Sequence, residues 1–141
     1  MKIEARNHRE VRGGMNWTGF DIDLYVDGVH ACHVRDEGHG GCLLYTKRNP
    51  DLMKSLEEYA EGHDRVEGLT CTVDTLVAMA VDEVEVEKRL RKDCKKVTLF
   101  RLPTDPDGEW RGFKIPFNPS VAQMVRTRYG SDVVIANERF N

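Results

Sequence analysis

The sequence predicts an α+β fold, with about three helices packed on an antiparallel sheet that an N-terminal meander and a C-terminal hairpin form. Apolar and polar residues alternate over 20–26, and Asp27-Gly28 then provides a strong hairpin turn. Two Asn-Pro pairs, at 49–50 and 118–119, each begin a helical pattern of apolar residues. A chain of 141 residues is long enough to bury its own core, so residues 1–141 are expected to form a single α+β domain.

The first third of the chain is expected to be a β-meander. Residues 2–7 suit a short strand, and residues 8–16 are polar, contain Gly13-Gly14 and are expected to form a loop. The strand over 20–26 follows, with one face on a core and one acidic face in water. After a glycine-rich loop, residues 42–46 are expected to form another strand.

The Asp27-Gly28 turn is compatible with two hairpin registers. A two-residue loop pairs Val26 with Val29 and sets His33 opposite Ile22. A three-residue loop with a bulge at Gly28 instead sets Cys32 against Ile22, and it is preferred because it buries the more apolar residues. This register also sets Val34 against Phe20, turns His33 and Arg35 outward, and turns His30 inward.

The remaining elements follow from caps and apolar periodicity. Asn49-Pro50 starts a helix that Gly62 ends, residues 62–70 form a loop, and Thr72 caps a second helix that runs to about Asp93. The last third is expected to contain strands at 97–102 and 109–115, a turn at 103–108, a helix from Pro119 to Tyr129 closed by Gly130, and a final strand at 133–136.

Charge is polarised along the chain although the net charge is only −3. Residues 51–87 hold eleven Asp and Glu against two basic residues, whereas residues 88–101 hold seven Lys and Arg against Asp93. The second helix is therefore acidic early and basic late, as its macrodipole favours. Two interpretations remain open, a solvated helix matched to its dipole or a basic surface for an anionic partner.

The cellular compartment is inferred from what the chain lacks. No apolar run approaches the ~20 residues of a membrane span, and the first ten residues are too polar for a secretory signal. The four cysteines are therefore expected to be free thiols, and the protein is expected to be cytoplasmic and without membrane contact.

Five histidine and cysteine residues, the types that bind zinc, occur between positions 30 and 42, but their spacing matches no standard zinc module. We therefore expect no metal and no cofactor. The candidate ligands of such a zinc site are His30, Cys32, His33, His39 and Cys42.

Glycines at 38, 40 and 41 require backbone freedom, so at least one is expected to have a positive φ. Either this loop is a tight turn, or its backbone N–H groups contact a ligand. The candidate ligand-binding residues here are Gly38, His39, Gly40 and Gly41.

Cationic and aromatic residues interleave in the C-terminal third, which suits an anionic nucleotide or a nucleic acid. Any anionic ligand is expected to bind here because residues 51–87 repel phosphate. The candidates are Arg101, Arg111, Lys114 and Arg126, with Lys95, Lys96, Trp110, Phe113 and Arg128 nearby. No motif identifies a nucleophile with a matched base, so an enzyme is not expected.

Two stretches resemble small uncharacterised accessory proteins of tailed bacteriophages. One is the glycine-rich run from Asp36 to Tyr45, and the other is the hairpin strand into Pro116, the short helix to Tyr129-Gly130 and residues 137–140. The resemblance implies a non-enzymatic protein in the bacterial host cytoplasm that inhibits a defence protein or sequesters an anionic nucleotide signal. A nucleic-acid-associated protein and a small enzyme remain alternatives, and the oligomeric state is open.

Overall fold

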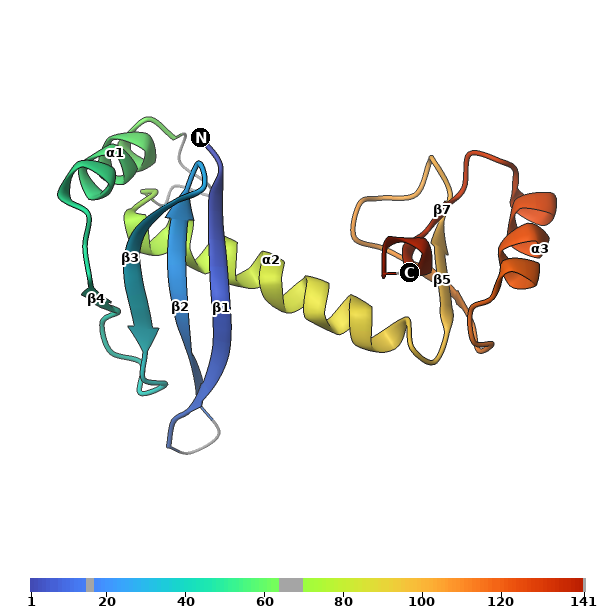
Figure 1. Cartoon of the computed structure of the whole chain (residues 1–141), viewed down its shortest axis with the longest axis horizontal. Helices are drawn as coiled ribbons and strands as arrows, with labels where there is room; N and C mark the ends of the chain where they lie inside the picture. Colours follow the sequence, from blue (N-terminus) through green and yellow to red (C-terminus); the bar gives the residue numbers. More distant parts are fainter. Residues whose placement is uncertain (15–16, 64–69, 141) are drawn as a thin grey trace. The chain divides into compact units, whose positions relative to one another are not determined.

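The computed structural model describes residues 1–14, 17–63 and 70–140, and it confirms the α+β class with antiparallel sheets and three α-helices. The meander and the C-terminal hairpin belong to two sheets (Figure 1). The chain divides into two compact units, Met1–Val84 and Glu85–Asn141. A single domain over 1–141 stays a prediction, and most of the predicted 62–70 loop lies outside the described residues.

The first unit contains a four-stranded antiparallel sheet in the order β1-β2-β3-β4. One face of this sheet is apolar because residues two apart on a strand share a side. Ile22 and Leu24 of β2 and Cys32 and Val34 of β3 are all fully buried on it. The four strands are β1 Ile3–Arg12, β2 Thr18–Val26, β3 Val29–Asp36 and β4 Leu44–Thr46.

Two helices complete the first core. The helix α1, Pro50–Glu61, contributes Leu56, and α2, Val73–Asp93, contributes Val77. The predicted caps are confirmed, since Asn49 accepts a hydrogen bond from the Leu52 N–H and Thr72 accepts one from the Thr75 N–H. None of the helices in the described ranges has the length and apolar character that a membrane crossing requires.

The predicted three-residue hairpin loop is wrong. Asp27 and Gly28 form a two-residue turn with φ values of 49° and 82°, and Val26 pairs with Val29. The extra residue enters one step later, at Ala31, because Tyr25 pairs with His30 but Leu24 pairs with Cys32. This bulge restores the apolar face, with Cys32 against Leu24 and Val34 against Ile22. His30 precedes the bulge and pairs with Tyr25, so it lies on the polar face, where it and His33 both contact Asp23.

The first strand is longer than predicted. Residues 8–12 were expected to be a loop, yet β1 continues to Arg12 and pairs with Thr18 to Asp21. The pairing with β2 shifts register at a bulge after Arg6, where Asn7 has a φ of 55°, and it resumes at Arg9. The pairing residues are largely polar, so hydrophobic alternation does not reveal them.

The second unit contains a three-stranded antiparallel sheet in the order β6-β5-β7, one helix and a short 3₁₀-helix. Its core stacks Phe100 on Phe113 with ring centroids 5.3 Å apart, and Tyr129 lies 4.8 Å from Phe100. Asn118 caps the helix by accepting from the Val121 N–H, as predicted. The elements are β5 Thr98–Arg101, β6 Arg111–Phe113, α3 Pro119–Tyr129, β7 Val134–Ile135 and η1 Ala136–Phe140.

One buried side chain ties the second unit together. Asn137, which is 2% exposed, accepts a hydrogen bond from the Leu99 N–H at 2.8 Å. Its amide nitrogen donates to the carbonyl oxygens of Cys94 and Val97 at 3.0 and 2.8 Å. The side chain therefore joins the 3₁₀-helix to the end of α2 and to the start of β5.

Candidate functional site

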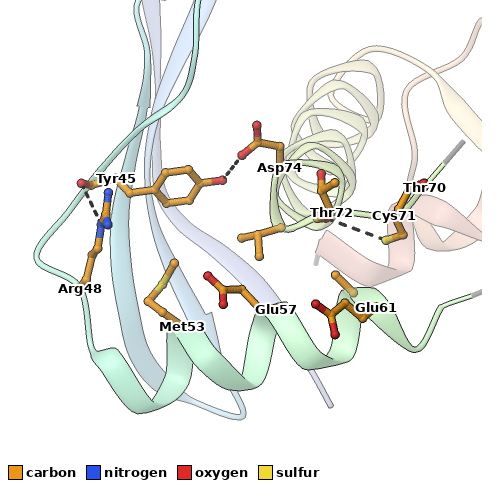
Figure 2. Close-up of a pocket in the computed structure, with 11 residues that line it drawn as sticks. Tyr45, Arg48, Met53, Glu57, Glu61, Thr70, Cys71, Thr72 and Asp74 are labelled. Carbon is orange, nitrogen blue, oxygen red and sulfur yellow. Dashed lines mark hydrogen bonds between the residues drawn. The ribbon is translucent and has the colours of Figure 1, made fainter.

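The first unit has a pocket of about 530 Å³ between β4, α1 and the start of α2, which we call the acidic pocket (Figure 2). This size falls within the ~300–1,000 Å³ typical of small-molecule sites. Its lining residues are Tyr45, Arg48, Met53, Glu57, Ala60, Glu61, Thr70, Cys71, Thr72, Val73 and Asp74.

The pocket is anchored by a hydrogen bond from the Tyr45 hydroxyl to Asp74 Oδ1, 2.5 Å long. It connects β4 to the first turn of α2, as Figure 2 shows. Burial of the ring, and then the bond to the Asp74 carboxylate, raise the pKa of Tyr45. The phenol therefore stays protonated at neutral pH and acts as a donor.

Three of the four charged residues in the lining are acidic. Glu57 and Glu61 lie one helical turn apart on α1, and Asp74 lines the pocket from α2, where it accepts the Tyr45 hydrogen bond. Arg48 is the one cation among the lining residues, and its Nε donates to the Tyr45 carbonyl oxygen at 3.3 Å. Figure 2 shows Arg48 at the β4 end of the pocket, on the far side from Glu61.

Apolar atoms form the rest of the wall. Met53 and Val73 are half-buried, and Ala60 is 3% exposed. The Tyr45 ring adds an aromatic surface. The combination of apolar walls with three carboxylates suits a cationic group on an apolar stem, since the stem fills the cavity and the charge meets the acids.

The predicted basic residues of the C-terminal third are largely neutralised within their own unit. Arg111 makes two hydrogen bonds to Asp105, at 2.9 and 3.1 Å, and these bonds raise its pKa and lower that of Asp105. Arg101 pairs with Asp107, and its guanidinium also lies 5.7 Å from the Trp110 ring. Both carboxylates belong to the predicted 103–108 turn.

The remaining predicted cations, on α3 and after β6, do not meet at one site. Arg126 pairs with Glu138 of the 3₁₀-helix, and Arg128 lies over the Tyr129 ring with 5.3 Å to its centroid. Lys114 is exposed. The structure therefore gathers no common anion site from Arg101, Arg111, Lys114 and Arg126, although a ligand role for each stays a prediction.

The glycine loop packs against the end of the first hairpin. Gly38 and Gly40 have φ values of 76° and 74°, which confirms the expected positive φ. The Gly38 N–H donates to Asp36 Oδ1 at 2.9 Å, so its donor is used within the loop. Exposed His39 and Gly41 keep their ligand role as a prediction.

The cysteine and histidine residues near the loop do not converge. Cys32 is buried on the core face, Cys42 is exposed, and His30 and His33 both contact Asp23 on the polar face. The preferred register turns His30 inward, to the same face as Cys32, and this prediction is wrong because the Ala31 bulge puts the two side chains on opposite faces. The described ranges contain no group of three or more His, Cys, Asp or Glu side chains suited to a metal ion.

Sequence reasoning missed the acidic pocket. The charge count over 51–87 was the available signal, but it did not place Tyr45 of β4 beside Asp74, 29 residues later. Comparison of the chain with protein-family models, curated proteins and solved structures finds no match.

Proposed function

We propose that this protein is a non-enzymatic binding protein whose acidic pocket takes a cationic group on an apolar stem, such as a Lys or Arg side chain of a partner protein. The observation that carries the proposal is the lining of the pocket, where the three carboxylates of Glu57, Glu61 and Asp74 outnumber the one cation, Arg48.

The charge of the pocket selects between the expected partners. Three carboxylates against one cation repel phosphate, because like charges within a few ångströms disfavour one another. A protein partner therefore fits this pocket better than an anionic nucleotide. Under the resemblance to phage accessory proteins, that partner is a defence protein of the bacterial host.

The chemistry of the polar groups supports binding rather than catalysis. The raised pKa of Tyr45 keeps its phenol protonated, so it serves as a donor and not as a general base. Burial raises the pKa of the Cys32 thiol to about 11 and also raises that of Cys94. These thiols are poor nucleophiles at neutral pH.

The nucleic-acid alternative depends on the C-terminal hairpin. Its arginines Arg101 and Arg111 are paired with Asp107 and Asp105, so contact with phosphate requires exchange of existing ion pairs. The net electrostatic gain from such an exchange is small. This favours the acidic pocket as the primary site.

The proposal can be tested by NMR titration of the full chain with blocked amino acids. We expect N-acetyl-lysine methylamide and N-acetyl-arginine methylamide to shift amide signals around Tyr45, Glu57 and Asp74. Neutral N-acetyl-norleucine methylamide and acidic N-acetyl-glutamate methylamide are expected to bind at least tenfold more weakly.

Charge-neutral variants identify the carboxylates involved. Glu57→Gln and Asp74→Asn should each weaken binding of the lysine probe several-fold, whereas Glu58→Gln, an equal charge change on the same helix outside the lining, should not. Equal binding of the lysine and norleucine probes, or an equal effect of all three variants, would contradict the proposal.

The partner class is tested separately by mass spectrometry of the protein purified from bacterial lysate. We expect a host protein that is retained by the wild type and by Glu58→Gln but lost from a Glu57→Gln/Glu61→Gln double variant. A co-purifying nucleotide without a protein would instead favour the anionic-signal alternative.

A further inference from the structure

The second unit has a pocket of opposite charge, with a volume of about 430 Å³, which we call the basic pocket. It lies at the end of α2, beside the segment after β6 and the 3₁₀-helix. Arg91 and Lys95 supply its charges, Phe117 and Phe140 supply aromatic rings, and its lining contains no Asp or Glu.

The two cations are better placed for a ligand than the arginines of the hairpin. The Arg91 guanidinium carbon lies 5.0 Å from the Phe140 ring centroid, a stacking contact that orients the group without neutralising it. Lys95 is exposed at the end of α2. Two neighbouring carboxylates are already engaged, since Glu87 pairs with Arg139 and Glu138 pairs with Arg126. The carboxylate of Asp93 acts on Cys94 of the lining and opposes an anion, but two cations face it in the pocket.

The local charge of the chain adds to the field in this pocket. Residues 88–96 carry six Lys and Arg against Asp93 alone. The negative end of the α2 macrodipole opposes an anion here, but that effect is a fraction of one charge. The effect of the macrodipole is also reduced, because the carbonyl oxygens at this end of α2 already accept hydrogen bonds. The backbone N–H groups of residues 94–97 donate to carbonyl oxygens of the last turns, and the Asn137 amide donates to those of Cys94 and Val97.

The aromatic residues define the rest of the ligand. Phe117 and Phe140 are half-buried, so each packs on the protein and still presents part of its ring to the pocket. Planar rings stack on aromatic side chains, and arginine and lysine contact phosphate or carboxylate. A volume of about 430 Å³ suits one small ligand with both features.

We propose that the basic pocket binds a small anion that carries an aromatic ring, of the nucleoside monophosphate class, with Arg91 and Lys95 at the phosphate and Phe117 and Phe140 at the base. The basic pocket shares no lining residue with the acidic pocket, so an experiment that disproves one proposal leaves the other standing. It differs from the predicted anion site because Arg101, Arg111 and Arg126 are held in ion pairs.

Isothermal titration calorimetry of the full chain with three probes tests this proposal. Adenosine monophosphate is expected to bind at least tenfold more tightly than either inorganic phosphate or adenosine, because only the nucleotide uses both halves of the pocket. Its affinity should fall with added salt. No detectable binding of the nucleotide at millimolar concentration would overturn the proposal, and equal affinity for phosphate and nucleotide would overturn the role of the rings.

Variants locate the site. Arg91→Ala and Lys95→Ala should each weaken nucleotide binding several-fold, and Phe140→Leu, which keeps an apolar side chain, should weaken the nucleotide more than phosphate. Lys92→Ala removes an exposed lysine of α2 outside the lining and should weaken binding far less than Arg91→Ala or Lys95→Ala. NMR shifts on adding the nucleotide should fall on residues 91–95, 116–117 and 137–140, and shifts confined to the glycine loop or the hairpin would contradict the assignment.

Discussion

The imidazole Nδ1 of His33 lies 2.9 Å from Oδ1 of Asp23, and both side chains project from the polar face of the first sheet. The other ring nitrogen of His33 contacts Asp21, which is 4% exposed. Asp23 also accepts a hydrogen bond from the Asn7 amide at 2.9 Å and contacts His30 at 3.2 Å. The face opposite the apolar core is therefore held together by a polar network.

This network predicts loss of stability in acid. The hydrogen bond from His33 and then that from Asn7 lower the pKa of Asp23 from 3.8 to about 2. Because the folded-state pKa lies below the unfolded value, the contribution is complete above about pH 4 and is lost as the pH falls toward 2. We expect Asp23→Asn to reduce the free energy of unfolding by roughly 1 to 2 kcal/mol at pH 7 and by almost nothing at pH 2.

Urea denaturation at pH 7, 4 and 2 measures this difference. Asp82→Asn, which removes an exposed acid from α2, is the control for a general change in charge. A constant difference between wild type and Asp23→Asn across this pH range would show that the network does not depend on ionised Asp23.

The glycines at the end of the first sheet predict a graded series of alanine variants. A Cβ on Gly19 would lie 1.9 Å from the Asp36 carbonyl oxygen, so Gly19→Ala should cost more than about 2 kcal/mol. Gly40→Ala meets no atom closer than 3.9 Å but keeps a positive φ, and should cost about 1 kcal/mol. Gly41→Ala has open space and should be neutral in urea denaturation; the reverse order would contradict the close packing.

Removal of the Asn137 side chain is expected to destabilise the second unit. Asn137→Ala leaves the Leu99 N–H and the Cys94 and Val97 carbonyl oxygens without this partner, and should cost about 3 kcal/mol or more. Hydrogen exchange should accelerate at Leu99 in particular. Gln123→Ala, which truncates an exposed amide side chain on α3 of the same unit, is the matched control and should leave exchange at Leu99 slow.

The thiols are expected to react in an order set by burial. Cys42 is exposed, Cys71 and Cys94 are half-buried, and Cys32 is fully buried with a pKa raised to about 11. Ellman's reagent should therefore modify Cys42 first and Cys32 only as the protein unfolds. The fast phase should disappear in Cys42→Ser, and its persistence would mean that another thiol is the accessible one.

The helices were predictable because their signals are local. The Asn-Pro pairs at 49–50 and 118–119 set two N-termini, and apolar periodicity set the extent of α2. The hairpin register was not predictable in the same way. A bulge at Ala31 adds one residue without a residue type that demands it, and only the pairing with Leu24 and Tyr25 reveals it.

For the sites, too, local properties of the sequence were predictable and contacts between distant residues were not. Counts of charge along the chain correctly separated an acidic segment from a basic one. They did not show that Asp105 neutralises Arg111 or that Glu138 neutralises Arg126, because these contacts depend on the fold of the turn and of the 3₁₀-helix. Which charged side chains are available to a ligand can be identified only once these ion pairs are known.

The contact of Gly13 and Gly19 with the backbone of residues 36–38 also offers a way to recognise relatives of this chain. Ideal Cβ atoms at positions 13 and 19 would lie 2.1 and 1.9 Å from carbonyl oxygens of Gly38 and Asp36. A homologue that keeps this end of the sheet must therefore keep glycine at both positions together, even where the rest of its sequence has diverged. Paired glycines six residues apart, followed by a third about nineteen residues later, form a search pattern that depends on backbone geometry rather than on overall identity.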